Sequence, residues 1–189
     1  MFHSRGQQPE AIEALRAAVQ LAPEDTQHHL DLGQVLHAAG RYDEEQEVYK
    51  KAIEVHPGLA LAYSYLAVSI LSSYQRSIGY RSYGKVEEDW VYIGRAEALF
   101  NKSLDLDPAC GLCHGQIGDM NKDAHRINQA IEHYTKSARL LSHMPTVFCN
   151  LVYTKMYGCD WSDYESDFAR ILALVRPTAH DTWDTWGSE

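Results

Sequence analysis

The chain has 189 residues, 45% of them hydrophobic and 23% charged, which suits one globular domain or one short solenoid. Its formal net charge of −9 argues against a general nucleic-acid binder, which needs a basic surface. No apolar run approaches the ~20 residues of a membrane span, and the polar stretch Met1 to Glu10 lacks the apolar core of a signal peptide. We therefore expect a cytoplasmic or nuclear location, with neither nucleic acid nor membrane as a partner.

Residues 8–23 have the period of the second helix of a helical hairpin. Ala11, Leu15 and Ala18 fall on one face at i, i+4 and i+7, and Pro23 stops the helix. The first helix of that hairpin is missing, so the apolar face of Leu15 lacks half of its usual cover. We expect upstream residues or a partner protein to cover it.

Residues 26–59 form a complete helix–turn–helix unit. Gly40 ends the first helix, where a residue with positive φ is needed, and Pro57 prevents the second helix from continuing. Pro23 and Pro57 are 34 positions apart, so the unit resembles a tetratricopeptide repeat (TPR), which has this period. Such a unit cannot bury its apolar faces alone, and its neighbours must stack on it.

Glu45 departs from this repeat pattern. It falls where a small residue normally lets two helices approach closely. We expect its carboxylate to reach solvent along its aliphatic stem, and the local packing to be looser there.

Residues 60–109 form a third unit with an insertion. Pro57 and Pro108 are 51 positions apart, about 17 more than the TPR period requires. The insertion lies near residues 72–90, and its Ser, Gly and Tyr content predicts a loop, with extension of both helices as the alternative at its ends. We expect residues 73–87 to be removable without unfolding. The basic and aromatic residues there suit single-stranded nucleic acid, but a solvated loop is the favoured interpretation.

The remaining residues complete the stack. A fourth unit spans residues 111–142, a closing helix pair spans residues 145–176, and residues 177–189 form a polar tail without periodicity. The predicted fold class is therefore all-α: a TPR-like solenoid of helical hairpins, a right-handed superhelix, with the closing pair at its end.

The last helix of the closing pair is expected to begin at Ser162. Ser162 and Glu165, three residues later, have the spacing of a capping box. Trp161 is expected to pack near Val152 or Met156 of the preceding helix and to fix the cap. An apolar stripe follows at helical spacing: Tyr164, Phe168, Ile171, Leu172 and Val175.

The segment from Cys159 to Tyr164 adds a feature that a generic TPR lacks. Its sequence, Cys-Asp-Trp-Ser-Asp-Tyr, lies directly behind the repeats and resembles the protein O-GlcNAc transferases, including Spindly-type relatives, where the repeats pass into the linker helices. The resemblance covers only the binding half of such an enzyme. It implies no catalytic residue and no cofactor within this chain.

In that family, a row of inner asparagines, one per repeat, hydrogen-bonds the backbone of an extended substrate peptide. An amide suits this role because it offers both a donor and an acceptor. The resemblance places the row at Asp31, Tyr65, Gln116 and Asn150, and Gln34 is a further inner position. Only Asn150 keeps the asparagine and Gln116 keeps the amide, so peptide binding of this kind is weakest in the first repeats.

Cys110, Cys113 and His114 spell C-x-x-C-H, the pattern of c-type haem attachment. The motif falls at the start of a repeat helix, where His114 takes an ordinary core position. A zinc site is the alternative, but a closed site needs four ligands. The favoured interpretation is buried or half-buried free thiols, with no metal.

The leading functional hypothesis is a protein-interaction module that holds an extended client segment on its inner face. The alternative is a fragment of an active O-GlcNAc transferase that uses UDP-GlcNAc, with its catalytic domain outside this chain. A third possibility, an adaptor that clamps a C-terminal carboxylate, needs Lys or Arg on the inner helices. Leu30, Gln34, Val68 and Asp119 supply none. Self-association through the exposed repeat ends is a further hypothesis for the partners.

Overall fold

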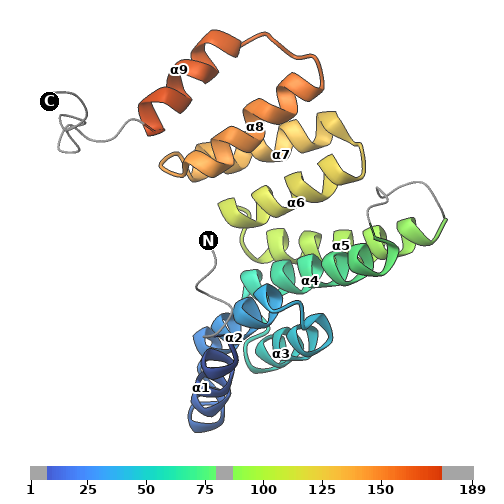
Figure 1. Ribbon diagram of the computed structural model, residues 1–189, viewed down its shortest axis with the longest axis vertical. Helices are drawn as coiled ribbons and strands as arrows, with labels where there is room; N and C mark the ends of the chain where they lie inside the picture. The colour runs from blue at the N-terminus through green and yellow to red at the C-terminus, as the bar shows by residue number, and fades with distance from the viewer. Residues whose placement is uncertain (1–7, 80–86, 176–189) are drawn as a thin grey trace, which may run out of the picture.

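A computed structural model describes residues 8–79 and 87–175, and these residues fold into a stack of helical hairpins (Figure 1). The helices are α1 (Gln8–Leu21), α2 (Thr26–Ala38), α3 (Tyr42–Val55), α4 (Ala60–Ile78), α5 (Glu87–Leu106), α6 (Gly111–Asp123), α7 (Ile127–Leu140), α8 (Pro145–Tyr157) and α9 (Tyr164–Val175). The predicted all-α, TPR-type solenoid is confirmed. Within the described ranges, no helix has the length and apolar character needed to cross a membrane.

Each complete hairpin is closed by an aromatic ring from its second helix. In the α2–α3 pair, Tyr49 lies so close to Gly33 that a Cβ on the glycine would be 2.3 Å from the ring. In the α6–α7 pair, a Cβ on Gly118 would be 2.7 Å from the ring of Tyr134. The missing side chain therefore lets the two helices of a hairpin approach closely.

Glu45 is buried, not extended toward solvent. It is 1% exposed, and its Oε1 atom lies 3.0 Å from Nδ1 of His37, across the turn of the same hairpin. The expectation that its carboxylate reaches solvent is wrong, because a partner inside the repeat replaces water. The hydrogen bond to Glu45 raises the pKa of His37 above its usual value, although burial acts in the opposite direction.

The described ends of the insertion are mainly helical. Helix α4 continues to Ile78 and α5 begins at Glu87, so these helices have 19 and 20 residues, against 13 and 14 in α2 and α3. Arg76, which the sequence analysis places in the loop, lies within α4. Residues 80–86 of the insertion lie outside the described residues. The alternative interpretation, in which the ends of the insertion extend both helices, is therefore the one that the described residues support.

A small core explains why the insertion is helical. Tyr74 is 6% exposed and donates a hydrogen bond through Oη to Oδ1 of Asp89 at 2.8 Å, and Asp89 is fully buried. The ring of Tyr74 stacks on that of Tyr92, with 3.9 Å between centroids. Deleting residues 73–87 would remove Tyr74 from this core, so we now expect that deletion to destabilise the chain. Tertiary packing here outweighs the weak helix preference of Ser and Tyr.

Helix α9 begins later and is capped differently than predicted. It starts at Tyr164, and Oδ1 of Asp160 accepts hydrogen bonds from the backbone nitrogen and the Oγ of Ser162, at 3.2 and 2.7 Å. The expected capping box of Ser162 and Glu165 is therefore wrong, because the serine hydroxyl is engaged with Asp160 in the preceding turn.

The closing pair is also packed more loosely than expected. Trp161 is 54% exposed and meets the edge of Tyr164, with ring centroids 5.6 Å apart, so its expected burial against α8 is wrong. Phe168 occupies the place of the hairpin aromatic but is 47% exposed. Val152 stands in α8 where Gly33 stands in α2, so this pair lacks the small residue found in the complete hairpins.

The Tyr74–Asp89 hydrogen bond can be tested by Tyr74→Phe, which removes only the hydroxyl. We expect a loss of about 1–3 kcal/mol in the free energy of unfolding, because a buried carboxylate loses a donor. Tyr63→Phe is the matched control, since the Tyr63 hydroxyl donates to the carbonyl of Pro57 at the surface. Urea denaturation measures both. Equal effects of the two changes would contradict a core role for Tyr74.

The His37–Glu45 pair predicts a pH-dependent stability. The pKa of His37 is higher in the folded than in the unfolded chain. The stabilisation is thus fully present below the unfolded pKa of about 6.5 and is lost as pH rises through the folded pKa. His37→Ala should cost about 1–3 kcal/mol at pH 6, because the buried Glu45 loses its partner, and less at pH 9. Urea denaturation at both pH values measures this, with His143→Ala as an exposed control. An equal loss at both pH values would contradict the ion pair.

Candidate functional site

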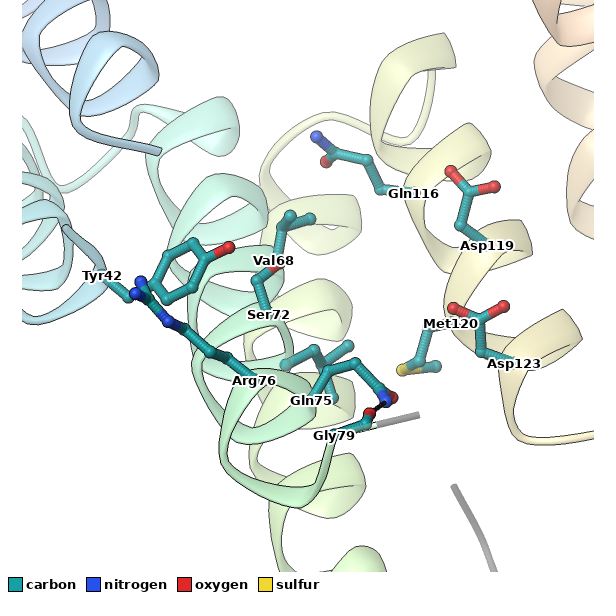
Figure 2. Close-up of a pocket in the computed structure, with 11 residues that line it drawn as sticks. Tyr42, Val68, Ser72, Gln75, Arg76, Gly79, Gln116, Asp119, Met120 and Asp123 are labelled. Carbon is teal, nitrogen blue, oxygen red and sulfur yellow. Dashed lines mark hydrogen bonds between the residues drawn. The ribbon is translucent and has the colours of Figure 1, made fainter. Parts of the chain in front are cut away.

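A groove of about 930 Å³ lies between α4 and α6 (Figure 2). It opens on the face formed by α2, α4 and α6, which we call the inner face. The side chains that matter most for its chemistry come from both helices: Val68, Arg76, Gln116, Asp119, Met120 and Asp123. One wall is built partly by the inserted residues, because Ser72, Arg76 and Gly79 also line the groove.

Arg76 fixes the α4 wall. Its Nη1 atom donates a hydrogen bond to the carbonyl of Gly40 at 2.6 Å, and its guanidinium lies 5.8 Å from the centre of the Tyr42 ring. Gly40 has a φ of 70°, as predicted for the turn between α2 and α3, and a Cβ there would lie 2.7 Å from Nη1. This cation of the groove is therefore already engaged with the neighbouring repeat.

The α6 wall is acidic. Asp119 and Asp123 are one helical turn apart and share a face of α6. Oδ1 of Asp119 accepts a hydrogen bond from Oη of Tyr134 at 2.5 Å and lies 3.5 Å from Nζ of Lys122. Asp123 is exposed and, among the described residues, has no ion-pair partner. Desolvation raises the pKa of Asp123 above its usual value; the Lys122 ammonium opposes this rise and the Asp119 carboxylate adds to it.

The floor and the upper part of the groove combine apolar and amide groups. Met120 is 4% exposed and Val68 is half-buried. Ser64 donates a hydrogen bond through Oγ to Oε1 of Gln116, which joins α4 to α6 and orients the amide. The Nε2 atom of Gln116 has no partner within residues 8–79 and 87–175. It is thus available to donate to a bound backbone carbonyl.

The five predicted peptide-binding positions are not brought together in one site. Gln116 lines the groove. Asp31, Gln34 and Tyr65 lie near one another on α2 and α4, where Nε2 of Gln34 donates to Oη of Tyr65 at 3.4 Å. Burial raises the pKa of Tyr65; the bond from Gln34 opposes this and the Asp31 carboxylate adds to it. Asn150 is exposed on α8 and is not among the groove residues.

Sequence reasoning did not assign Arg76, Met120 or Asp123 to a site. Arg76 was placed in a loop, and Met120 carries no polar signal. Asp123 could have been found, because it repeats the charge of Asp119 four residues later on an inner helix. Two carboxylates at that spacing repel each other.

The C-x-x-C-H motif builds a structural link at the start of α6. Cys110 and Cys113 form a disulfide and are 7% and 0% exposed, so the expectation of free thiols is wrong. Their Cα atoms are 5.2 Å apart at the helix start, within the range that a disulfide spans. Nδ1 of His114 lies 3.1 Å from Nδ1 of His133, and burial lowers the pKa of both. In the described part of the chain, no three His, Cys, Asp or Glu side chains are arranged to hold a metal.

Two family profiles match the first part of the chain. One described as "TPR repeat" matches residues 1–40, and one described as "Tetratricopeptide repeat" matches residues 29–58. The chain therefore contains TPR repeats, as its 34-residue spacing predicted.

Two curated proteins share parts of the sequence. Superkiller protein 3 of Saccharomyces cerevisiae is 30% identical over 105 residues, which is 53% of this chain and 7% of that protein. The CTR9 homolog of Arabidopsis thaliana is 26% identical over 155 residues, which is 77% of this chain and 13% of that protein. The chain thus spans a small fraction of the length of both relatives.

Solved TPR proteins share the fold. A thermophilic TPR protein from Thermus thermophilus has a TM-score of 0.75 at 15% identity, covering 90% of this chain and 84% of its own. MamA from Desulfovibrio magneticus RS-1 has a TM-score of 0.62 at 17% identity, covering 94% and 90%. YrrB, described as a TPR protein with an unusual peptide-binding site, has a TM-score of 0.54 at 12% identity, covering 91% and 80%.

Proposed function

We propose that this chain is a protein-interaction module that holds an extended segment of a partner protein in the groove between α4 and α6. The observation that carries the proposal is the groove itself, which combines an apolar floor with amide and carboxylate groups on its walls. Its volume of about 930 Å³ lies in the range of specific binding pockets. YrrB, a neighbour in fold that is described as having an unusual peptide-binding site, supports peptide binding as one use of this fold.

The chemistry of the groove suits an extended peptide. An extended segment exposes its backbone donors and acceptors, and the Gln116 amide and the Ser72 hydroxyl can pair with them. The apolar surface of Val68 and Met120 can take an alternate side chain of the segment. Because the groove is built from helices of two repeats, it is a rigid and preformed surface.

Peptide selection tests the proposal. Peptides selected from a random phage-displayed library on the purified chain should bind in the groove, and Ser72→Trp should fill it and weaken them at least about tenfold. Lys102→Trp, on the exposed surface of α5, is the matched control and should leave the affinity unchanged. Calorimetric titration measures the affinities, and thermal melting checks that each variant folds. Unchanged binding by Ser72→Trp, or a selection that yields no binder, would contradict the proposal.

The finer hypothesis, a relationship to the protein O-GlcNAc transferases, rests on the segment from Cys159 to Tyr164 and remains a proposal. We expect this chain alone to transfer no sugar, because the resemblance places the nucleotide-sugar domains beyond the linker helices. Purified chain mixed with labelled UDP-GlcNAc and a Ser/Thr-rich peptide should incorporate no more label than heat-denatured chain. Incorporation above that control would show an active transferase.

A further inference from the structure

We propose that the segment bound in the groove carries an Arg or Lys. Its cationic head group pairs with Asp119 and Asp123, and its aliphatic stem crosses Met120. This inference rests on the proposed function and names the chemistry of the segment that the groove accepts.

The charges of the groove favour a cation. Asp119 and Asp123 project from the same face of α6 on one side of the groove (Figure 2). Like charges at this spacing destabilise a helix by about 0.2–0.5 kcal/mol. Lys122 is 3.5 Å from Asp119, and no described Lys or Arg is paired with Asp123. A ligand cation would remove the repulsion and supply the missing partner.

Asp119 is held in place from inside the solenoid. Tyr134 is 1% exposed, and its hydroxyl reaches Oδ1 of Asp119 from the core. The contact with Lys122 also involves Oδ1. Oδ2 is therefore left for a ligand, and the carboxylate needs little ordering when the ligand binds. A guanidinium can bridge two such carboxylates, and an ammonium can pair with them as a point charge.

The opposite wall does not favour an anion. The guanidinium of Arg76 is turned to the Gly40 carbonyl and the Tyr42 ring, so an acidic ligand would have to displace both contacts. The floor beside the acidic pair is apolar, because Met120 lies between the two carboxylates in sequence and lines the groove with them. The stem of a long basic side chain can pack there while its head group stays at the carboxylates.

A positional-scanning library of immobilised nonapeptides tests the inference, because it fixes each amino acid at each position in turn. The wild-type chain should retain Arg- or Lys-containing pools at least about tenfold better than Glu-containing pools at one position. Asp119→Asn with Asp123→Asn should reduce this preference to within about twofold, since the amides keep the shape but not the charge.

The matched control is Asp43→Asn with Glu47→Gln. These exposed carboxylates have the same spacing on α3 and are not among the residues that line the groove, and the double change alters the net charge equally. The control chain should keep the full preference. If both double variants lose the preference equally, the preference reflects a general attraction of basic peptides to an acidic protein. That result would overturn the inference.

The remaining outcomes separate this inference from the proposed function. Peptides that bind the wild-type chain, fail on Ser72→Trp and show no preference for basic residues would overturn the inference and leave the groove as a binding site. A preference for acidic residues would also overturn it. If the wild-type chain retains no pool at all, both proposals are wrong.

Discussion

The contact between a small residue in one helix and an aromatic ring from the next is the constraint on which this solenoid depends. In the fourth unit, Gly118 leaves room for the ring of Tyr134. In the third unit, Ala67 takes the glycine position and the ring is that of Phe100; both are fully buried or nearly so. In the closing pair the position is Val152, and the hairpin does not close around its aromatic residue. In the described hairpins, a glycine or alanine at this position accompanies a buried ring, and the valine of the closing pair accompanies an exposed one.

The same contact connects the core to the groove. Because Gly118 lets the ring of Tyr134 lie against α6, the tyrosine hydroxyl reaches Asp119 and fixes one carboxylate of the acidic wall. The other wall depends on the insertion, which lengthens α4 by more than a turn and adds Ser72 and Arg76 to the lining. The groove therefore depends on two features that a plain repeat array lacks. One is the hydroxyl of the core residue Tyr134, and the other is the lengthened helix α4.

Much of the fold could be predicted because its signals are local. The proline spacing marked the repeat units, and Gly40 marked the turn that the structure places there. The failures involve partners that are distant in the sequence or on another helix. The sequence alone did not predict burial of Glu45, because its partner His37 lies on the other helix of the hairpin. The polar composition of the insertion likewise gave no sign of the buried Tyr74–Asp89 hydrogen bond.

The candidate site was predicted less completely for the same reason. Gln116 was found through the resemblance, because its position in the repeat is fixed by the sequence period. Arg76 and Asp123 belong to different repeats, and the groove that α4 and α6 line together could not be predicted from the sequence. Asn150 keeps the expected amide, but it stands on α8, beyond the residues that form the groove.

The buried carboxylates of the fold and the carboxylates of the groove have different surroundings. Glu45 and Asp89 are buried, and each meets a partner within its own hairpin, a histidine for Glu45 and a tyrosine for Asp89. Asp123 is placed differently: it lines the groove, its side chain is exposed, and no described Lys or Arg forms an ion pair with it. The core carboxylates are paired inside the fold, whereas the pair on α6 stays accessible beside an apolar floor. That contrast, more than the acidity of the chain as a whole, is the reason for proposing the α6 wall as the surface that selects a basic partner segment.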